Sequence, residues 1–167
     1  MSIQVDNIHT ISLHVANKPG VLLRITLMFA RRGYNIESLV VSSALDGKFS
    51  RMTITAQGAP ETLDQIIRQA NNLIDVVHAS EHNDEEAIAK EMVLIKVKLS
   101  KTNKNEILQV IDHFKAQSVD LTQKSAIIQA VGDSDRIDAL IDMLKDYGII
   151  ETVRSGKLVM ARGDQST

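Results

Sequence analysis

The feature that most constrains the fold is an order of strands and helices that occurs twice. From His9 to Val15 apolar and polar residues alternate, as they do in a strand with one buried face. Apolar residues then recur at helical spacing from about Pro19 to Arg32, ahead of Gly33, which suits a left-handed helix end. A hairpin turning at Asp46-Gly47, a helix from Pro60 and the strand "DVVHAS" follow. The order is βαββαβ.

The second half of the chain repeats this order. Val93 to Leu99 alternate as a strand, a helix follows around Ile107 to Phe114, "SVDLTQ" and "AIIQAV" read as strands, and a last helix ends at Gly148. A repeat at roughly 80 residues indicates structural duplication. We therefore predict an α+β fold of two tandem ferredoxin-like βαββαβ sandwiches, each with two helices on one face of its sheet.

The boundary between the two halves is marked by composition. Residues 81–90, "EHNDEEAIAK", break the apolar pattern and carry many charges, which is typical of a solvated linker, although a short acidic interaction helix is an alternative. We expect a first domain over 1–82, a linker over 83–91 and a second domain over 92–167. Ser155-Gly156 is expected to reverse the chain into "KLVMAR" as an edge hairpin strand.

The face of the first sheet that its helices leave uncovered should be polar. We expect the side chains on this face to be exposed to solvent: Thr10, Ser12, His14, Arg51, Thr53 and Thr55. The edge strands of such a small sheet remain open to pairing, and a second copy of the chain is the commonest closed solution. We expect a homodimer.

Composition excludes several classes of function. Lys and Arg total 19 against 21 Asp and Glu, so no strong field attracts nucleic acid or an anionic membrane. The absence of cysteine excludes disulfides and thiolate chemistry and fits a cytoplasmic protein. The start of the sequence has no secretory leader pattern, and no uncharged apolar run approaches the roughly 18 residues of a membrane span.

The stretch "ANKPGVLLR", residues 16–24, is the best candidate for a site. Backbone N–H groups near Pro19, Gly20 and Val21 should point into solvent with the helix dipole behind them, which suits a small carboxylate such as a free amino acid. Asn17 adds a donor and an acceptor. The alternative is purely structural: Asn17 caps the helix and Pro19 sets its first turn.

Other candidate centres are weaker. His78 and His82 have a spacing seen in metal sites on helices, but here they fall on a strand end and its linker, and no third ligand is evident, so we expect no metal. No nucleophile motif or phosphate loop is present, so no catalytic residue is expected. Four lysines lie close together in the second half and present either a solvated surface or a protein contact; they are Lys96, Lys98, Lys101 and Lys104.

Several of these segments resemble one known family. "NKPGVL", "RRGYNIESL", "SRMTI", "EMVLIKV", "VRSG" and "ARGD" are similar to the regulatory small subunit of acetolactate synthase, also called acetohydroxyacid synthase, whose N-terminal part is an ACT domain. The resemblance covers nearly the whole chain. The family pattern has alanine where this chain has Val153. This difference lies away from the proposed site and affects only the local packing.

The resemblance implies a homodimeric regulator that activates the catalytic large subunit and mediates feedback inhibition by valine or a related branched-chain amino acid. It implies no cofactor in this chain, with thiamine diphosphate, Mg²⁺ and FAD in the catalytic subunit. The ACT domain, 1–82, would bind the effector where two such domains meet. The residues implied are Asn17 and the backbone of Gly20, Val21 and Leu22 from one protomer, with Asn35 and Ile36 from the other; Leu22 or Val21 would also touch the effector's aliphatic side chain.

Two rival functions share the predicted fold. An RNA-recognition domain has the same element order but stacks bases on aromatic residues of its central strands, and "SRMTITA" and "AIIQAV" carry none. A small enzyme would need a perturbed acid or base in a pocket, and no paired carboxylates converge on the predicted sheet. A regulator, by contrast, should be inert until the catalytic subunit is added.

Overall fold

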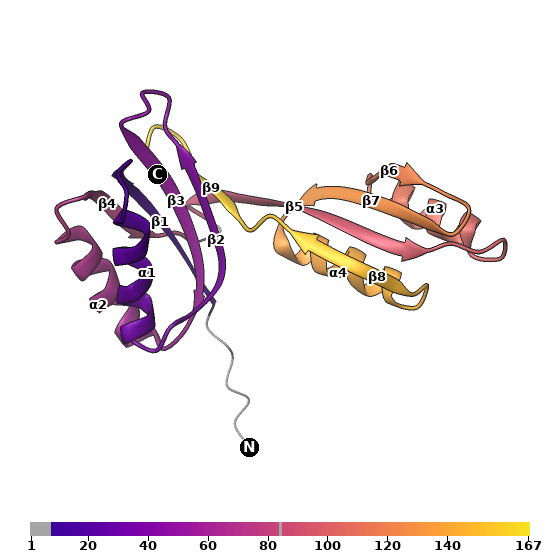
Figure 1. Cartoon of the computed structure of the whole chain (residues 1–167), viewed down its shortest axis with the longest axis horizontal. Helices are drawn as coiled ribbons and strands as arrows, with labels where there is room; N and C mark the ends of the chain where they lie inside the picture. The colour runs from indigo at the N-terminus through magenta and orange to yellow at the C-terminus, as the bar shows by residue number, and fades with distance from the viewer. Residues whose placement is uncertain (1–7, 84) are drawn as a thin grey trace, which may run out of the picture. The chain divides into compact units, whose positions relative to one another are not determined.

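The computed structural model describes residues 8–83 and 85–167, and they form two units (Figure 1). The first contains the chain up to Ala89 together with Gly156–Thr167, and the second is Lys90–Ser155. Residues 1–7 of the predicted first domain and Asp84 of the predicted linker lie outside the described residues. None of the helices in the described ranges has the length and apolar character needed to cross a bilayer.

The first unit is a four-stranded antiparallel sheet with two helices on one face. Its elements are β1 (Ile8–Ala16), α1 (Val21–Arg31), β2 (Asn35–Ser43), β3 (Phe49–Gln57), α2 (Pro60–Asn71) and β4 (Val76–Glu81). The strand order is β2-β3-β1-β4, which leaves β2 and β4 at the edges. Asn71 ties α2 to β4 because its side chain bonds both the N–H and the carbonyl of Ala79, at 2.9 Å each.

The core of this unit follows the alternation read from the sequence. Ile11, Leu13 and Val15 of β1 are at most 2% exposed and face Ile25 and Phe29 of α1 in one buried cluster. Helical spacing in the sequence predicts one apolar stripe on the second helix, made by Leu63, Ile66, Ile67, Ala70 and Ile74, and this prediction was wrong at its end. Ile74 is 96% exposed because α2 stops at Asn71 and the following turn carries Ile74 away from the core.

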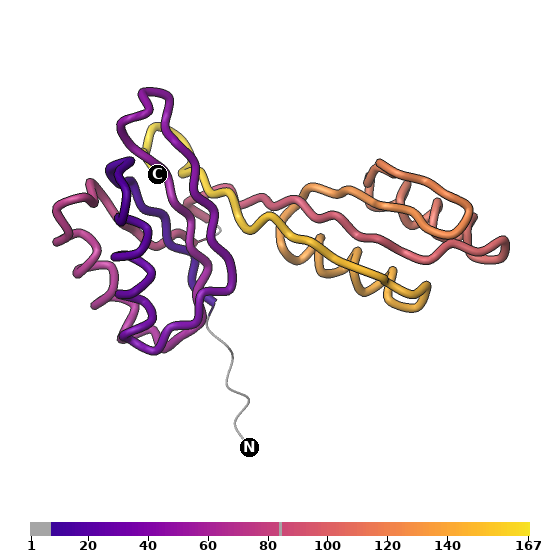
Figure 2. Tube along the Cα trace, in the orientation of Figure 1, coloured from indigo at the N-terminus to yellow at the C-terminus, as the bar shows by residue number. Residues whose placement is uncertain are grey.

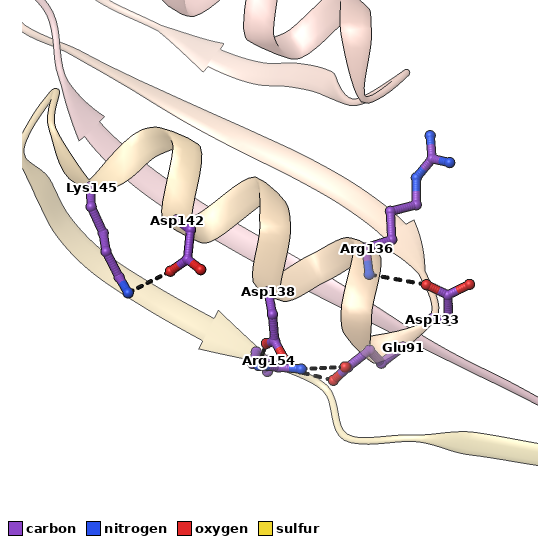
Figure 3. A network of polar contacts seen from close by, with 7 residues as sticks. All are labelled: Glu91, Asp133, Arg136, Asp138, Asp142, Lys145 and Arg154. Carbon is purple, nitrogen blue, oxygen red and sulfur yellow. Dashed lines mark hydrogen bonds and ion pairs between the residues drawn. The ribbon is translucent and has the colours of Figure 1, made fainter.

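The second unit repeats the same plan. Its elements are β5 (Ala87–Lys98), α3 (Lys104–His113), β6 (Gln117–Leu121), β7 (Ser125–Gly132), α4 (Ser134–Lys145) and β8 (Ile149–Arg154). The order β6-β7-β5-β8 matches that of the first sheet, strand for strand. The predicted tandem ferredoxin-like architecture is therefore confirmed. Asp133 caps α4 by accepting a hydrogen bond from the Arg136 N–H at 3.0 Å (Figure 3).

The predicted hairpin at Ser155-Gly156 was wrong. The last strand, β9 (Leu158–Ala161), pairs with β5 and not with β8. β5 pairs with β7 from Glu91 onward and with β8 from Val93 onward, so its first residues extend beyond both partners. Their backbone groups remain open to another strand, and a local turn pattern cannot specify which open edge a strand will take.

This pairing also places the last residues of the chain with the first unit. Gly156–Thr167 belongs to that unit by its contacts, whereas the sequence pattern includes it in a second domain over 92–167. The predicted linker is partly a strand, since β5 begins at Ala87, where that residue is 4% exposed. The acidic stretch therefore includes the start of a long strand that runs on into the second unit.

The prediction that the outer face of the first sheet is solvated was wrong for half of its residues, although Arg51 is exposed and Thr10 and His14 are partly exposed. Ser12 is 5%, Thr53 8% and Thr55 6% exposed. Ser12 Oγ lies 2.5 Å from Nε2 of His82, whose pKa is lowered chiefly by burial. The hydroxyl side chains at the centre of this face are therefore buried inside the unit.

The chain end lies on this face (Figure 2). Gly156 lies so close to β2 that an added Cβ would be 2.9 Å from Val40. Arg51 Nη1 donates a hydrogen bond to the main-chain oxygen of Thr167, and Thr167 Oγ1 accepts one from the N–H of Ala161 at 2.7 Å. The final residues therefore contact Arg51, one of the polar side chains that the sequence pattern assigns to solvent.

One consequence of this burial is measurable. Among the described residues, Thr55 Oγ1 is a buried side-chain polar atom with no hydrogen-bond partner. Thr55→Val keeps the shape and removes that group, so it should raise the free energy of unfolding by about 1 kcal/mol. Ser12→Ala removes a bonded hydroxyl and should lower it by about 1 kcal/mol. Urea unfolding followed by circular dichroism tests the pair, and a loss of stability in Thr55→Val would contradict the assignment.

Candidate functional site

The start of α1 presents unpaired backbone donors. Gly20 is the residue before the helix, with φ 84° and ψ −11°, a left-handed conformation that favours glycine. Its carbonyl accepts the hydrogen bond of Arg24 N–H at 3.1 Å. Within the described residues, the N–H groups of Gly20, Leu22 and Leu23 form no hydrogen bond. Several donors and the positive end of the helix dipole therefore meet at one place.

No side chain in the described part of the chain caps this helix start. Asn17 lies further back, and its amide nitrogen donates to Gly47 O at 3.0 Å and to Ser43 Oγ at 3.5 Å. Its backbone N–H donates to Lys48 O at 2.9 Å. The structural alternative, that Asn17 caps the helix, was therefore wrong: Asn17 ties the loop to the β2–β3 turn. Its Oδ1 accepts no hydrogen bond from the described residues and remains available.

The two apolar residues after Gly20 have different surroundings. The side chain of Val21 is 3% exposed and packs in the core with Ile25 and Phe29. Leu22 is 42% exposed. Of the two residues named for contact with an aliphatic ligand, the structure leaves Leu22 at the surface. The predicted role of Val21 is not supported, because its side chain is buried and its N–H, expected to point into solvent, donates to Lys18 O at 3.4 Å.

Asn35 and Ile36 open β2 at the other end of α1. Asn35 is exposed and its amide nitrogen donates to Oε1 of Glu37, whereas Ile36 is partly buried against the core. Since α1 has 11 residues, its two ends are roughly 16 Å apart. One protomer therefore does not bring Asn35 next to Asn17, and a site that uses both residues needs two copies of the chain.

Asn35 is positioned by a rigid aromatic neighbour that the sequence does not reveal. Gly33, with φ 74°, turns the chain after α1, and Tyr34 is then 5% exposed with its hydroxyl donating to Ala59 O. Burial raises the pKa of the Tyr34 hydroxyl. Gly58 lies against the Tyr34 ring, which leaves no room for a Cβ there. The start of β2 is thus fixed by contacts with the β3–α2 connection.

Two of the other sequence candidates have partners of their own. His82 contacts Ser12 and also lies 3.3 Å from Ser80 Oγ, so its neighbours are hydroxyls. In the second unit, Lys96 pairs with Glu151 at 3.1 Å. The outer face of the first sheet, where an RNA-recognition domain would stack bases, is buried at its centre, which argues against that rival.

Comparisons with known proteins agree along the chain. A profile described as an AHAS small subunit-like ACT domain matches residues 11–78, and one described as small subunit of acetolactate synthase matches residues 90–163. A probable acetolactate synthase small subunit of Archaeoglobus fulgidus is 41% identical over 157 residues, covering 94% of this chain and 98% of that one. The acetolactate synthase small subunit of Bacillus subtilis is 38% identical over 156 residues, covering 93% and 91%.

A solved structure gives the same result. The crystal structure of the acetolactate synthase small subunit from Thermotoga maritima superposes with a TM-score of 0.84 at 34% identity, covering 95% of this chain and 99% of that one. The likeness therefore extends over both units.

Proposed function

This chain belongs to the acetolactate synthase small-subunit family, and we propose that it activates a catalytic large subunit and mediates feedback inhibition by valine or a related branched-chain amino acid. The observation that carries the effector role is the set of free N–H groups at Gly20, Leu22 and Leu23. On this proposal, catalysis and its thiamine diphosphate, Mg²⁺ and FAD belong to the large subunit, and both subunits act in the cytoplasm.

The chemistry of the loop fits an amino-acid zwitterion. The carboxylate accepts hydrogen bonds from the free N–H groups at the positive end of α1. The ammonium donates to Asn17 Oδ1, and the aliphatic side chain contacts Leu22, which is 42% exposed. No acidic side chain is needed, because the charge of the ligand is matched by backbone and amide groups.

A homodimer through the edge of the first sheet completes the site on this proposal. β2 is an edge strand whose Val41 is 43% exposed. Leu22, Thr26 and Ala30 are four residues apart and form one line along α1, with two small residues that allow close approach. Pairing two copies about a two-fold axis would place Asn35 and Ile36 of one protomer near the loop of the other. Regulation then follows if the effector favours one dimer arrangement over another.

Calorimetric titration of valine, leucine and isoleucine onto the full chain tests the effector site. Asn17→Ala should weaken binding about tenfold or more, because it removes a hydrogen bond to a charged group. Asn105→Ala, at an exposed asparagine on α3 of the second unit, should leave the affinity unchanged. Unchanged affinity in Asn17→Ala would remove that residue from the site.

Reconstitution tests the regulatory role. The chain alone should form no acetolactate, while addition to the purified catalytic subunit should raise activity, and valine should reduce that gain. Asn17→Ala should still activate but lose sensitivity to valine. If the chain has no effect on the catalytic subunit, the proposed function is wrong.

A further inference from the structure

The outward side of α1 and α2 carries a groove that the effector site does not use. Its volume is about 550 Å³, and its lining residues are Arg24, Leu27, Met28, Arg31, Arg32, Gln69, Asn72 and Leu73. The lining combines three apolar side chains, Leu27, Met28 and Leu73, with the side chains of three arginines. This combination is unlike the effector loop, where backbone donors dominate.

The positive charge of the groove is only partly balanced. Arg24 pairs with Asp75, and Arg32 donates to the neutral Gln65. Arg31 makes no hydrogen bond or ion pair with any described residue. The chain as a whole has a net charge of −2, so this cluster of arginines is a positively charged patch on a protein with a slight negative net charge.

Apolar surface continues from the groove. Leu27, in the lining, is 42% exposed, and Leu23, one turn earlier, is 61% exposed. Ile74, just beyond the lining residue Leu73, is 96% exposed. A groove lined by both apolar side chains and arginines fits an amphipathic segment that presents apolar side chains together with carboxylates, as in helix-in-groove recognition.

A small anion fits less well. Arg24 and Arg32 are held apart by different partners, Asp75 and Gln65, so their donors do not converge on one point. Single-stranded nucleic acid would require aromatic stacking platforms, and none of the described residues that line the groove is aromatic. A protein segment with carboxylates is the occupant that uses both the apolar lining residues and the separated arginines.

The groove is also distinct from the dimer surface proposed above. At 100° per residue, Arg24, Leu27 and Arg31 lie on the side of α1 that faces α2, with Leu27 toward solvent. Leu22, Thr26 and Ala30 lie on the other side of the buried stripe. Both surfaces can therefore be occupied at once.

We propose that the α1–α2 groove is the docking surface for an acidic amphipathic segment of the catalytic subunit. This inference rests on the proposed function, since the partner is the one that function requires. It predicts that charge in the groove governs assembly while leaving the effector loop intact.

The test measures binding of the full chain to purified catalytic subunit, without effector. Arg31→Glu should weaken binding at least about tenfold, with a smaller effect at high salt. Arg31→Gln, which avoids an anion at the helix C-terminus, should weaken it about threefold. Leu27→Ser should weaken it about tenfold by removing apolar contact. Lys124→Glu and Leu121→Ser make matched changes at exposed positions of the second unit and should leave binding unchanged.

The outcomes separate the two proposals. Valine titration onto Arg31→Glu should give wild-type affinity, which shows that this variant is folded. If Arg31→Glu and Leu27→Ser bind and activate the catalytic subunit as the wild type does, the groove assignment is overturned and the regulatory function stands. If the second-unit variants weaken binding instead, docking belongs to that unit and the groove is again excluded. If the wild-type chain neither binds nor activates, both proposals fail.

Discussion

Replacing Arg154 by alanine should destabilise the second unit by about 3 kcal/mol, the lower end of the range for breaking a buried ion pair, because Arg154 itself is partly exposed. Its guanidinium bonds both carboxylate oxygens of Glu91, with Nε at 3.1 Å from Oε2, and Asp138 at 2.6 Å (Figure 3). The Glu91 side chain is 4% exposed, whereas that of Arg154 is 36% exposed. The variant therefore leaves a buried carboxylate without its bidentate partner, and the charged form of Glu91 becomes costly.

The same contacts explain why the pKa of Arg154 is raised. The hydrogen bond to Glu91 raises the pKa of Arg154, with a further contribution from Asp138. Three elements are joined through this one side chain, since Glu91 lies on β5, Arg154 on β8 and Asp138 on α4. Loss of the guanidinium thus loosens a helix and two strands together.

Hydrogen exchange on the full chain measures this effect unit by unit. Amides of β5, β8 and α4 should exchange faster in Arg154→Ala, while those of α1 and β3 in the first unit should not change. Lys145→Ala is the matched control. It breaks an exposed pair with Asp142 on the same helix, at 2.5 Å, and should leave exchange unaltered (Figure 3). Equal behaviour of the two variants would show that the Glu91 pair does not stabilise the unit.

Gly58→Ala should destabilise the first unit by about 2 kcal/mol and weaken effector binding as well. An added Cβ would lie 2.6 Å from Tyr34 Cδ1 and closer still to Cε1, so the ring has to move. Tyr34 is buried beside Phe29 in an edge-to-face contact and donates to Ala59 O, and movement disturbs both. Asn35 follows it directly in the chain, so the start of β2 shifts with the ring.

The control uses the same substitution against a flexible neighbour. At Gly132 an added Cβ would lie 2.9 Å from Cδ of Arg136, whose long side chain can adjust, so Gly132→Ala should change stability by less than about 0.5 kcal/mol. Valine titration and urea unfolding are then compared for both variants. Wild-type stability and affinity in Gly58→Ala would mean that the Tyr34 contact does not position Asn35.

Local sequence patterns predicted most of the secondary structure. Alternation placed β1 and helical spacing placed α1, because each pattern reports which side of one segment is buried. Gly33 and Gly148 both mark helix ends in the left-handed conformation, and the Asp46-Gly47 turn is present. The twofold βαββαβ order needed nothing beyond such short-range signals.

The candidate site was predicted as a location but not in its detail. "NKPGVL" identified the loop, yet the pattern could not distinguish a cap by Asn17 from the arrangement observed. That choice depends on Gly47 and Ser43, some 26 to 30 residues away, which accept the hydrogen bonds of the Asn17 amide. The contact between Tyr34 and Gly58 was equally invisible, because it joins two segments through packing and not through any motif.

The sequence alone determined the kinds of element, their duplicated order and the loop that offers backbone donors, since these follow from periodicity and turn chemistry within a few residues. Tertiary structure decided where β9 pairs, why Ser12 and Thr53 are buried, and how arginines from one helix come to border an apolar groove beside another. The physical reason is that strand edges, polar faces and grooves are completed by segments far away in the chain, and no local pattern records which segment arrives there.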